Sequence, residues 1–432
     1  MSEFQAGVGF SRNLNPKIAG EEVIASALEN LDKDPKFVLL FSTIHYARKE
    51  RKGMQKFVEA AYDALPKKAI PMIGGSVAGF INKHGVFAKG ATALAVYCDV
   101  MDVAAGYGKG VKRNPRKAAR NCAKMIKQKK KNKYKSKLLI NIISSPTVPT
   151  LPKIGRINVV KSKILGELLT YLTPIFSLKG QGIGEEFLAI EELSNILQEY
   201  RIIGGSATDD GQCFESYQFF NSQTYRDSIV ALAISTTFNI IMKTSSRLVE
   251  VKEFEITQTF RERIIRKINK TKAKKYFFSK VLGVPSELFK KLGPFYHKAS
   301  MHFPLGTPDK TFITALGGIF GDNLVLGHKL PQKNLATFSI DGKNLKKSFE
   351  DIIFKKAKIE DIPLTAILII SIGYLVSLGY KVSYIRKFIN KLNIPYLGIF
   401  SLTENIRINK KLYTRAYSIN LLVLNKKTKN EF

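Results

Sequence analysis

The order of motifs in the first half of the chain constrains its fold more than any other feature, because that order occurs twice. Gly7 opens a glycine-rich segment that is followed by an Asn-Pro pair at residues 15–16, and Gly106 opens a second one that is followed by Asn-Pro at residues 114–115. Both motifs are shifted by the same 99 residues. Asn is a favoured helix N-cap and Pro suits the first helical position, so each copy predicts that a helix begins there.

A third motif, Ile-Gly-Gly-Ser, follows later in both copies, at residues 73–76 and 203–206. Its offset is larger, 130 residues, which indicates an insertion in the second copy after Pro146. A shared order of three motifs indicates two related α/β units, and we expect them to pack with pseudo-two-fold symmetry.

Hydrophobic patterns elsewhere predict strands that alternate with helices. Apolar runs at residues 37–43 and 365–371 are typical of buried strands, and residues 54–65 and 116–128 have the spacing of amphipathic helices. The chain is therefore expected to have a mixed α/β fold bordering on α+β, with layered mixed sheets and flanking helices. The expected domains are a first repeat unit at residues 1–101, a second at residues 102–246 and a C-terminal α/β domain at residues 247–432.

Cysteine usage and hydropathy indicate a cytoplasmic protein. The three cysteines, Cys98, Cys122 and Cys213, lie far apart and cannot form a disulfide framework. The first residues lack the basic and apolar regions of a secretory signal. Residues 362–380 carry no charge, but they contain Pro363 and two glycines. We therefore expect a buried strand and a turn there, with no membrane insertion.

The formal net charge of +34 is unusual and raises the possibility of polyanion binding. Such an excess of Lys and Arg attracts nucleic acids and anionic surfaces without specificity. The densest basic run, at residues 127–137, contains no Arg and lies between a predicted helix and a predicted strand. This run resembles a solvated loop more than a base-reading surface, and a lysine-rich composition bias accounts for the charge without a partner. A basic nucleic-acid-associated protein is the alternative interpretation of function.

Several motifs together resemble the FIST family over nearly the whole chain. The signature stretch of its N-terminal domain is similar to residues 203–210, followed by residues 217–219 and the strand at 229–233. The segments that resemble the linking region and the C-terminal domain are residues 249–257, 263–269, 273–283, 302–306 and 398–404, and the first unit shares the glycine motifs at residues 7–11 and 73–76.

The resemblance implies an intracellular sensory role. FIST proteins are described as binding small molecules, possibly amino acids, and as feeding a signalling output domain. We expect a stand-alone sensor that acts through a signalling protein partner. The chain departs from the family pattern after residues 365–371, where Ser371 and Tyr374 stand in place of the family's Cys and Arg region. It also has Thr403-Glu404 where the family favours Gly-Glu.

The predicted ligand site lies at the glycine motifs. We expect Gly74, Gly75, Ser76, Gly204, Gly205 and Ser206 to form turns that follow strands, where glycines let backbone N–H groups approach a ligand. Asp209 and Asp210 could then bind an amine, and Glu404 is the family's C-terminal contribution. The alternative is a tight turn that an aspartate caps.

No residue pattern predicts catalysis or a metal. The histidines (His45, His84, His297, His302 and His328) show no i,i+4 pair, so zinc is not expected. A haem-binding sensor, with His45 as the axial ligand, is a second alternative. Glu185-Glu186 is expected on a solvated face, and no cysteine has a basic partner in a known signature. We therefore expect a binding protein without a cofactor and without enzymatic activity.

Overall fold

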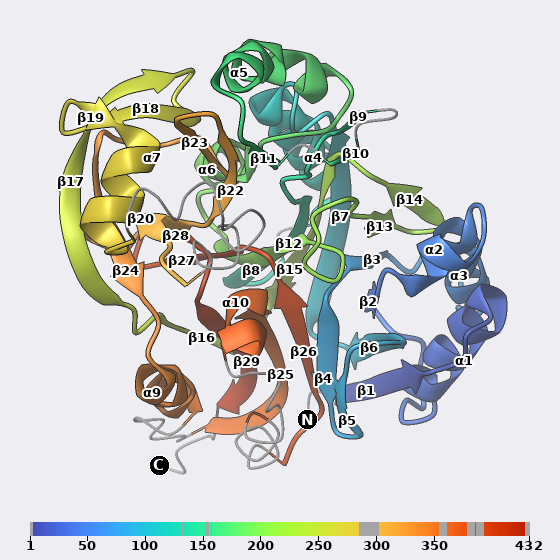
Figure 1. Ribbon diagram of the computed structural model, residues 1–432. Coiled ribbons are helices and arrows are strands. Elements are labelled where there is room, and N and C mark those ends of the chain that lie inside the picture. Colours follow the sequence, from blue (N-terminus) through green and yellow to red (C-terminus); the bar gives the residue numbers. More distant parts are fainter. Residues whose placement is uncertain are drawn as a thin grey trace.

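A computed structural model of the chain describes residues 3–131, 133–151, 155–156, 158–284, 302–353, 361–377, 385 and 393–427. Within them the predicted mixed α/β fold is confirmed, because helices cover sheets that contain both parallel and antiparallel strand pairs. Figure 1 shows the first unit with its helices in blue, at the right of the molecule.

The first sheet has the strand order β1-β6-β2-β3-β13-β14. In it β2 and β3 are parallel, whereas β6 is antiparallel to both β1 and β2. The first unit contributes β1 (Phe4–Ser11), α1 (Pro16–Leu28), β2 (Phe37–Ser42), α2 (His45–Lys49), α3 (Gly53–Asp63), β3 (Met72–Ser76), β4 (Gly79–Asn82), β5 (Gly85–Phe87) and β6 (Ala91–Cys98).

The second unit repeats this order as β7-β15-β8-β12-β27-β28, again with one parallel pair, β8 and β12. Its elements are β7 (Met101–Lys109), α4 (Pro115–Lys129), β8 (Ser136–Ser144), α6 (Glu186–Ile196), β12 (Arg201–Ala207), β13 (Gln218–Phe220), β14 (Gln223–Tyr225) and β15 (Ser228–Thr236). The predicted helix starts are confirmed, because the side chains of Asn15 and Asn114 accept hydrogen bonds from the first-turn N–H groups of α1 and α4.

A third sheet, which the motifs do not reveal, has the same order once more: β16-β29-β25-β26-β4-β5. The parallel pair is now β25 and β26. The chain therefore contains three units of one topology rather than two. The third unit supplies β16 (Asn239–Ser245), α9 (Gly342–Ile353), β25 (Asp361–Ser371), α10 (Ile372–Ser377), β26 (Tyr396–Ser401), β27 (Glu404–Ile408), β28 (Lys411–Arg415) and β29 (Ile419–Lys427).

Each sheet is completed by a hairpin from another unit, in cyclic order. The β13–β14 hairpin of the second unit pairs with β3 of the first, the β27–β28 hairpin of the third pairs with β12 of the second, and the β4–β5 hairpin of the first pairs with β26 of the third. The sheets therefore do not follow the domain limits expected from the sequence. Residues 239–245, expected in the second unit, form β16 of the third sheet.

The inner faces of the three sheets share one hydrophobic core. Equivalent positions in β2, β8 and β25 are filled by Leu39, Ile140 and Ile367, each 5% exposed or less. The outer faces carry helices: α1 and α3 on the first sheet, α4 and α6 on the second, and α9 on the third. The buried strand predicted at residues 365–371 is confirmed in β25. No helix within the described ranges is long and apolar enough to cross a membrane.

Strand register also corrects the alignment of the repeat. In the first sheet, Gly9 of β1 lies in the same row of paired residues as Gly74 of β3, through partners in β6 and β2. In the second sheet, Gly106 of β7 lies in the same row as Gly204 of β12, through partners in β15 and β8. Gly9, not Gly7, is therefore the equivalent of Gly106. The loop before the Asn-Pro pair is two residues longer in the second unit, which produced the apparent match at a constant offset.

Two insertions extend the second and third units and pack against each other. The inner face of α5 places Leu169 and Phe176 against Ile264, Phe320 and Val325. Figure 1 shows α5 at the top of the molecule, beside β18 and β22. The insertions comprise β9 (Thr150–Leu151), β10 (Gly155–Arg156), β11 (Val159–Val160), α5 (Lys163–Leu178), β17 (Val249–Phe260), β18 (Ile264–Ile268), β19 (Thr271–Lys272), α7 (Ala273–Tyr276), the π-helix Phe277–Val281, β20 (Leu305–Gly306), β21 (Phe312–Thr314), β22 (Leu316–Phe320), β23 (Asn323–Leu326) and β24 (Asn334–Ser339).

Candidate functional site

The glycine motifs lie inside strands, so their interpretation as turns is wrong. Gly74, Gly75 and Ser76 belong to β3, and Gly204, Gly205 and Ser206 belong to β12, with a neighbouring strand on each side. Their N–H groups serve the sheet: Ser76 N donates to Tyr217 O at 2.8 Å, and Ser206 N donates to Thr403 O at 2.8 Å.

Close packing explains the glycines instead. A Cβ atom at position 74 would lie 1.6 Å from the carbonyl oxygen of Leu40, and one at position 204 would lie 2.4 Å from the side chain and the carbonyl oxygen of Asn141. Neither backbone can accept a side chain without moving, because a Cβ cannot approach a heavy atom that closely. The motifs therefore recur because the units pack in the same way.

The two aspartates face their own loop and an arginine of the first unit. Asp209 is fully buried and accepts hydrogen bonds from Cys213 N and Phe214 N, both at 2.8 Å, and its burial raises its pKa. Asp210 is half-exposed and forms a bidentate pair with Arg48 at 2.6 and 3.0 Å, which lowers the pKa of Asp210. Both Asp209 oxygens are thus used to shape the loop.

Glu404 lies beside Gly205, its register partner across β12 and β27, but it is buried. Its carboxyl group accepts hydrogen bonds from Ser401 Oγ at 2.7 Å and from Ser418 Oγ at 3.1 Å. Burial raises the pKa of Glu404 well above its ordinary value. The guanidinium of Arg415, which bonds Thr244 Oγ1, attracts the carboxylate form but only partly offsets that effect. The Glu404 carboxyl group bonds the ends of neighbouring strands, and it lines neither of the two described pockets.

A second buried polar cluster, which the sequence did not reveal, lies where β8 and β12 end. Lys112, from the loop after β7, is 2% exposed, and its Nζ donates to Thr147 Oγ1 and Gly180 O, both at 3.1 Å. Burial lowers the pKa of Lys112, although Asp227 and Glu186 oppose the shift. This cluster gathers residues from positions 112 to 328 in the chain.

Glu186 is the unusual member of this cluster. It is 1% exposed, at the N-terminus of α6, and neither of its oxygens has a hydrogen-bond donor among the described residues. The ring of His328 lies beside it, with Nε2 at 3.3 Å from Oε2 of Glu186. The expectation that Glu185-Glu186 is solvated is therefore wrong; Glu185 is also buried and pairs with Arg263. A buried carboxylate without a donor is costly and is more typical of functional sites.

Cys213 lies near the same cluster. The charge of Lys112 acts on its thiol, yet burial dominates and raises the pKa of Cys213 to about 12. A thiol in that state is a poor nucleophile at neutral pH. Cys213 is therefore not a candidate nucleophile of this cluster.

A pocket of about 430 Å³ opens directly above Lys112. Its charged lining is strongly basic, with a single carboxylate, Glu262. Glu262 is paired with Lys329 at 2.7 Å, whereas no carboxylate within hydrogen-bonding reach of Arg113 or Arg261 occurs among the described residues. The lining residues are Lys112, Arg113, Pro174, Ile175, Ser177, Leu178, Arg261, Glu262, Arg263 and Lys329. We call this the basic pocket.

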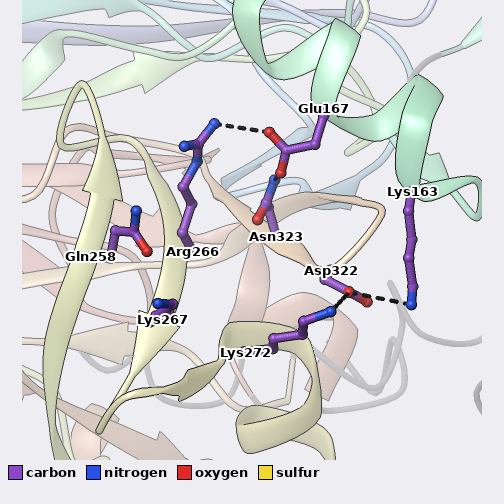
Figure 2. Close-up of a pocket in the computed structure, with 8 residues that line it drawn as sticks. All are labelled: Lys163, Glu167, Gln258, Arg266, Lys267, Lys272, Asp322 and Asn323. Carbon is purple, nitrogen blue, oxygen red and sulfur yellow. Dashed lines mark hydrogen bonds and ion pairs between the residues drawn. The ribbon is translucent and has the colours of Figure 1, made fainter.

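A second pocket, of about 320 Å³, lies at the start of α5, and three of its four cations are paired with its two carboxylates. Figure 2 shows Glu167 bonded to Arg266 and Asn323, and Asp322 paired with Lys163 and Lys272. The basic pocket is the better candidate for an anionic ligand because two of its arginines are not engaged by carboxylates.

His45 does not have the surroundings of a haem ligand. Its Nδ1 bonds Thr43 Oγ1 at 2.7 Å, and its ring lies against Tyr46 with centroids 3.8 Å apart. Its Nε2 is buried without a partner, and burial lowers the pKa of His45 to about 4. Neither described pocket is lined by it. His297 lies outside the described residues, within which no group of His, Cys, Asp and Glu could hold a metal.

Comparison with solved structures gives remote similarities. A cyanuric acid hydrolase described as an "evolutionary innovation by structural concatenation" is 9% identical, covers 55% of this chain and 70% of its own, and has a TM-score of 0.27. Cyanuric acid hydrolase from A. caulinodans is 9% identical, with 54% and 71% covered and a TM-score of 0.25. T. maritima PurL complexed with AMPPCP is 10% identical, with 98% and 72% covered and a TM-score of 0.19. These scores are too low to inform fold or function.

Comparison with protein families gives a direct result. No curated protein matches the chain. The family model of the FIST N domain, however, matches residues 11–271, which is more than half of the chain and includes both glycine motifs and the loop of Asp209. The C-terminal FIST domain is not detected separately. The chain therefore belongs to the FIST family, whose domain is a sensory domain of signal transduction proteins.

Proposed function

We propose that this FIST protein senses a small molecule that carries a carboxylate, such as an amino acid, and that the ligand binds in the basic pocket. The supporting observation is the excess of cations there over the single carboxylate Glu262. Arg113 and Arg261 would bind the ligand carboxylate, because a guanidinium pairs with a carboxylate through two hydrogen bonds. Glu262 would accept from the ligand ammonium group.

The buried cluster beneath the pocket supports a sensory role. Lys112 lines the pocket and interacts electrostatically with Glu186, whose oxygens have no donor within the described part of the chain. An anion bound above Lys112 would favour its charged form and draw it toward the pocket. The contacts of Lys112 with Thr147 and Gly180 would then change, which offers a route from the ligand to the loops around β8 and β12. The signalling partner would respond to those loops.

A thermal-shift screen of amino acids and related carboxylates tests the site. A ligand that binds only the folded protein stabilises it by about 2.7 kcal/mol at a hundredfold excess over Kd. We expect Arg113→Ala and Arg261→Ala each to weaken binding by about 10- to 100-fold, as is typical for the loss of a charged hydrogen bond. Arg51→Ala removes an exposed arginine in the turn before α3 and should leave the affinity unchanged.

The same screen separates this site from the loop site expected from the sequence. Asp210→Ala should not change the affinity for the ligand, because the Asp210 carboxylate is already bonded to Arg48. A ligand whose binding is abolished by Asp210→Ala but unaffected by Arg113→Ala and Arg261→Ala would move the site to that loop. Hits confined to cations or uncharged metabolites would reject the proposal.

The net charge of +34 supports nucleic-acid association as the second candidate function. Charge alone predicts binding to RNA and duplex DNA that falls by about 10³-fold or more between 50 and 200 mM salt. Filter binding at both salt concentrations distinguishes the two cases. Affinity that survives the higher salt with a preference for one sequence would favour a nucleic-acid-binding function over the sensory one.

A further inference from the structure

The outer face of α5 carries a row of exposed apolar side chains. Six of the eleven large hydrophobic residues that are exposed in the described part of the chain lie on this one helix. Five of them recur at helical spacing along a single line, which we call the α5 ridge, and Leu165 lies beside it. The ridge residues are Ile164 (86% exposed), Leu168 (54%), Tyr171 (57%), Ile175 (48%) and Leu178 (64%).

The helix is held firmly on its opposite side. Leu169 and Phe176 are buried against the inserted strands β18, β22 and β23. Gly166 packs so tightly that a Cβ there would lie 2.4 Å from Gly321 N. The ridge therefore faces outward, because the opposite face of α5 is packed against these strands. A contiguous exposed apolar row of this kind marks an interaction surface more often than scattered apolar residues do.

The charge that borders the ridge is positive. Towards the start of α5, Glu167 and Asp322 are neutralised by Arg266, Lys163 and Lys272, as Figure 2 shows. Arg266 also lies 5.5 Å from the ring centre of Tyr171. Towards its end, Ile175 and Leu178 line the basic pocket with its excess of arginine and lysine. The acidic groups beside the ridge are thus paired with cations of the same molecule. The remaining, unpaired charge beside the ridge is positive.

We propose that the α5 ridge binds peripherally to membranes that contain anionic lipids. Apolar side chains on one line would enter the boundary between headgroups and acyl chains, and the flanking cations would contact the lipid phosphates and carboxylates. An excess of cations suits a layer of anionic headgroups. A second copy is disfavoured because pairing two ridges would bring two basic surfaces together. The helix would lie on the bilayer without spanning it.

Vesicle binding by the full chain tests the proposal. We expect co-sedimentation with vesicles of 70% phosphatidylcholine and 30% phosphatidylserine, and at least tenfold weaker binding to phosphatidylcholine alone. The variant Ile164→Ser/Leu168→Ser should bind the anionic vesicles at least tenfold more weakly. A matched control, Leu14→Ser/Ile18→Ser, removes two exposed apolar residues from the first unit, one just before α1 and one within it. This variant should bind the anionic vesicles as the wild type does.

A fluorescent variant locates the contact. The chain has no tryptophan, so Leu168→Trp introduces a single reporter on the ridge. Its emission should shift to the blue when anionic vesicles are added. An unshifted emission, or full vesicle binding by the serine variant, would overturn the proposal by reducing it to charge attraction. A wild-type dimer in light scattering that the serine variant abolishes would instead assign the ridge to a second copy. The amino-acid thermal shift of the serine variant checks its fold and reports separately on the proposed sensory site.

Discussion

Gly74→Val is expected to lower the free energy of unfolding by about 3 kcal/mol or more, enough to deplete folded protein in cells. The reason is geometric: β3 passes so close to β2 that even the first side-chain atom at position 74 would lie 1.6 Å from the carbonyl oxygen of Leu40. That oxygen belongs to the backbone of a buried strand and cannot rotate away. Gly204→Ala should act in the same direction in the second sheet, at 2.4 Å from Asn141 O.

Gly342→Ala provides the matched control for these variants. Gly342 begins α9, and a Cβ there would meet no atom within 4 Å. The change should be neutral or slightly stabilising, since alanine is the better helix former. Urea unfolding of purified proteins, without any ligand, gives the comparison. If Gly74→Val and Gly204→Ala were as stable as the wild type, the glycines would not be required for packing, and a ligand-binding role for them would become the better explanation.

The chain's sequence contained enough local information for most elements of the fold, but not for the third unit. Asn-Pro pairs stand at helix starts in the first two units, whereas α9 begins after Asp341, which caps the helix through Lys343 N but is not part of an Asn-Pro pair. The insertion β17–β24 also separates β16 from α9 and hides the repeat in the sequence. The exchange of hairpins could not be predicted, because pairing β4 with β26 depends on three-dimensional packing and joins residues more than three hundred positions apart.

The candidate site was harder to predict than the fold for a related reason. Lys112, Glu186 and His328 come from three distant parts of the chain, and none belongs to a spaced motif. One signal was available: the glycine-rich run at residues 180–184 directly precedes Glu185-Glu186, and glycines before an acidic pair indicate close packing there. The basic pocket also depends on Arg261 in the β17–β18 turn, where a left-handed φ of 51° sets its position. Local sequence does not reveal such a contact.

Burial of Glu404 predicts that stability falls as pH rises, and that Glu404→Gln removes this dependence. Its pKa is raised in the folded state, so above the ordinary carboxyl pKa the folded protein retains a proton that the unfolded chain releases. Proton release then favours unfolding, by about 1.4 kcal/mol for each pH unit between the unfolded and folded pKa values. Below that window both states are protonated and no penalty remains. Glutamine mimics the neutral acid: its oxygen can accept from Ser418 N, and the Ser401 hydroxyl, which donates to Glu404 in the wild type, would turn to accept from the amide.

Urea unfolding at pH 5, 6, 7 and 8 therefore separates two descriptions of this buried group. We expect Glu404→Gln to match the wild type at pH 5 and to exceed it by a growing margin toward pH 8. Glu21→Gln, on α1, is the control and should leave the pH profile unchanged. If Glu404 were instead ionised and paired with Arg415, removing its charge would leave a buried guanidinium without its partner, and the variant would be less stable than the wild type by about 3 to 5 kcal/mol at pH 7. The guanidinium of Arg415 bonds Thr244 Oγ1, and the three donors around Glu404 come from two serines. Those donors favour the carboxylate, but complete burial outweighs them and raises the pKa of Glu404, so we expect the neutral acid and the first of these two outcomes.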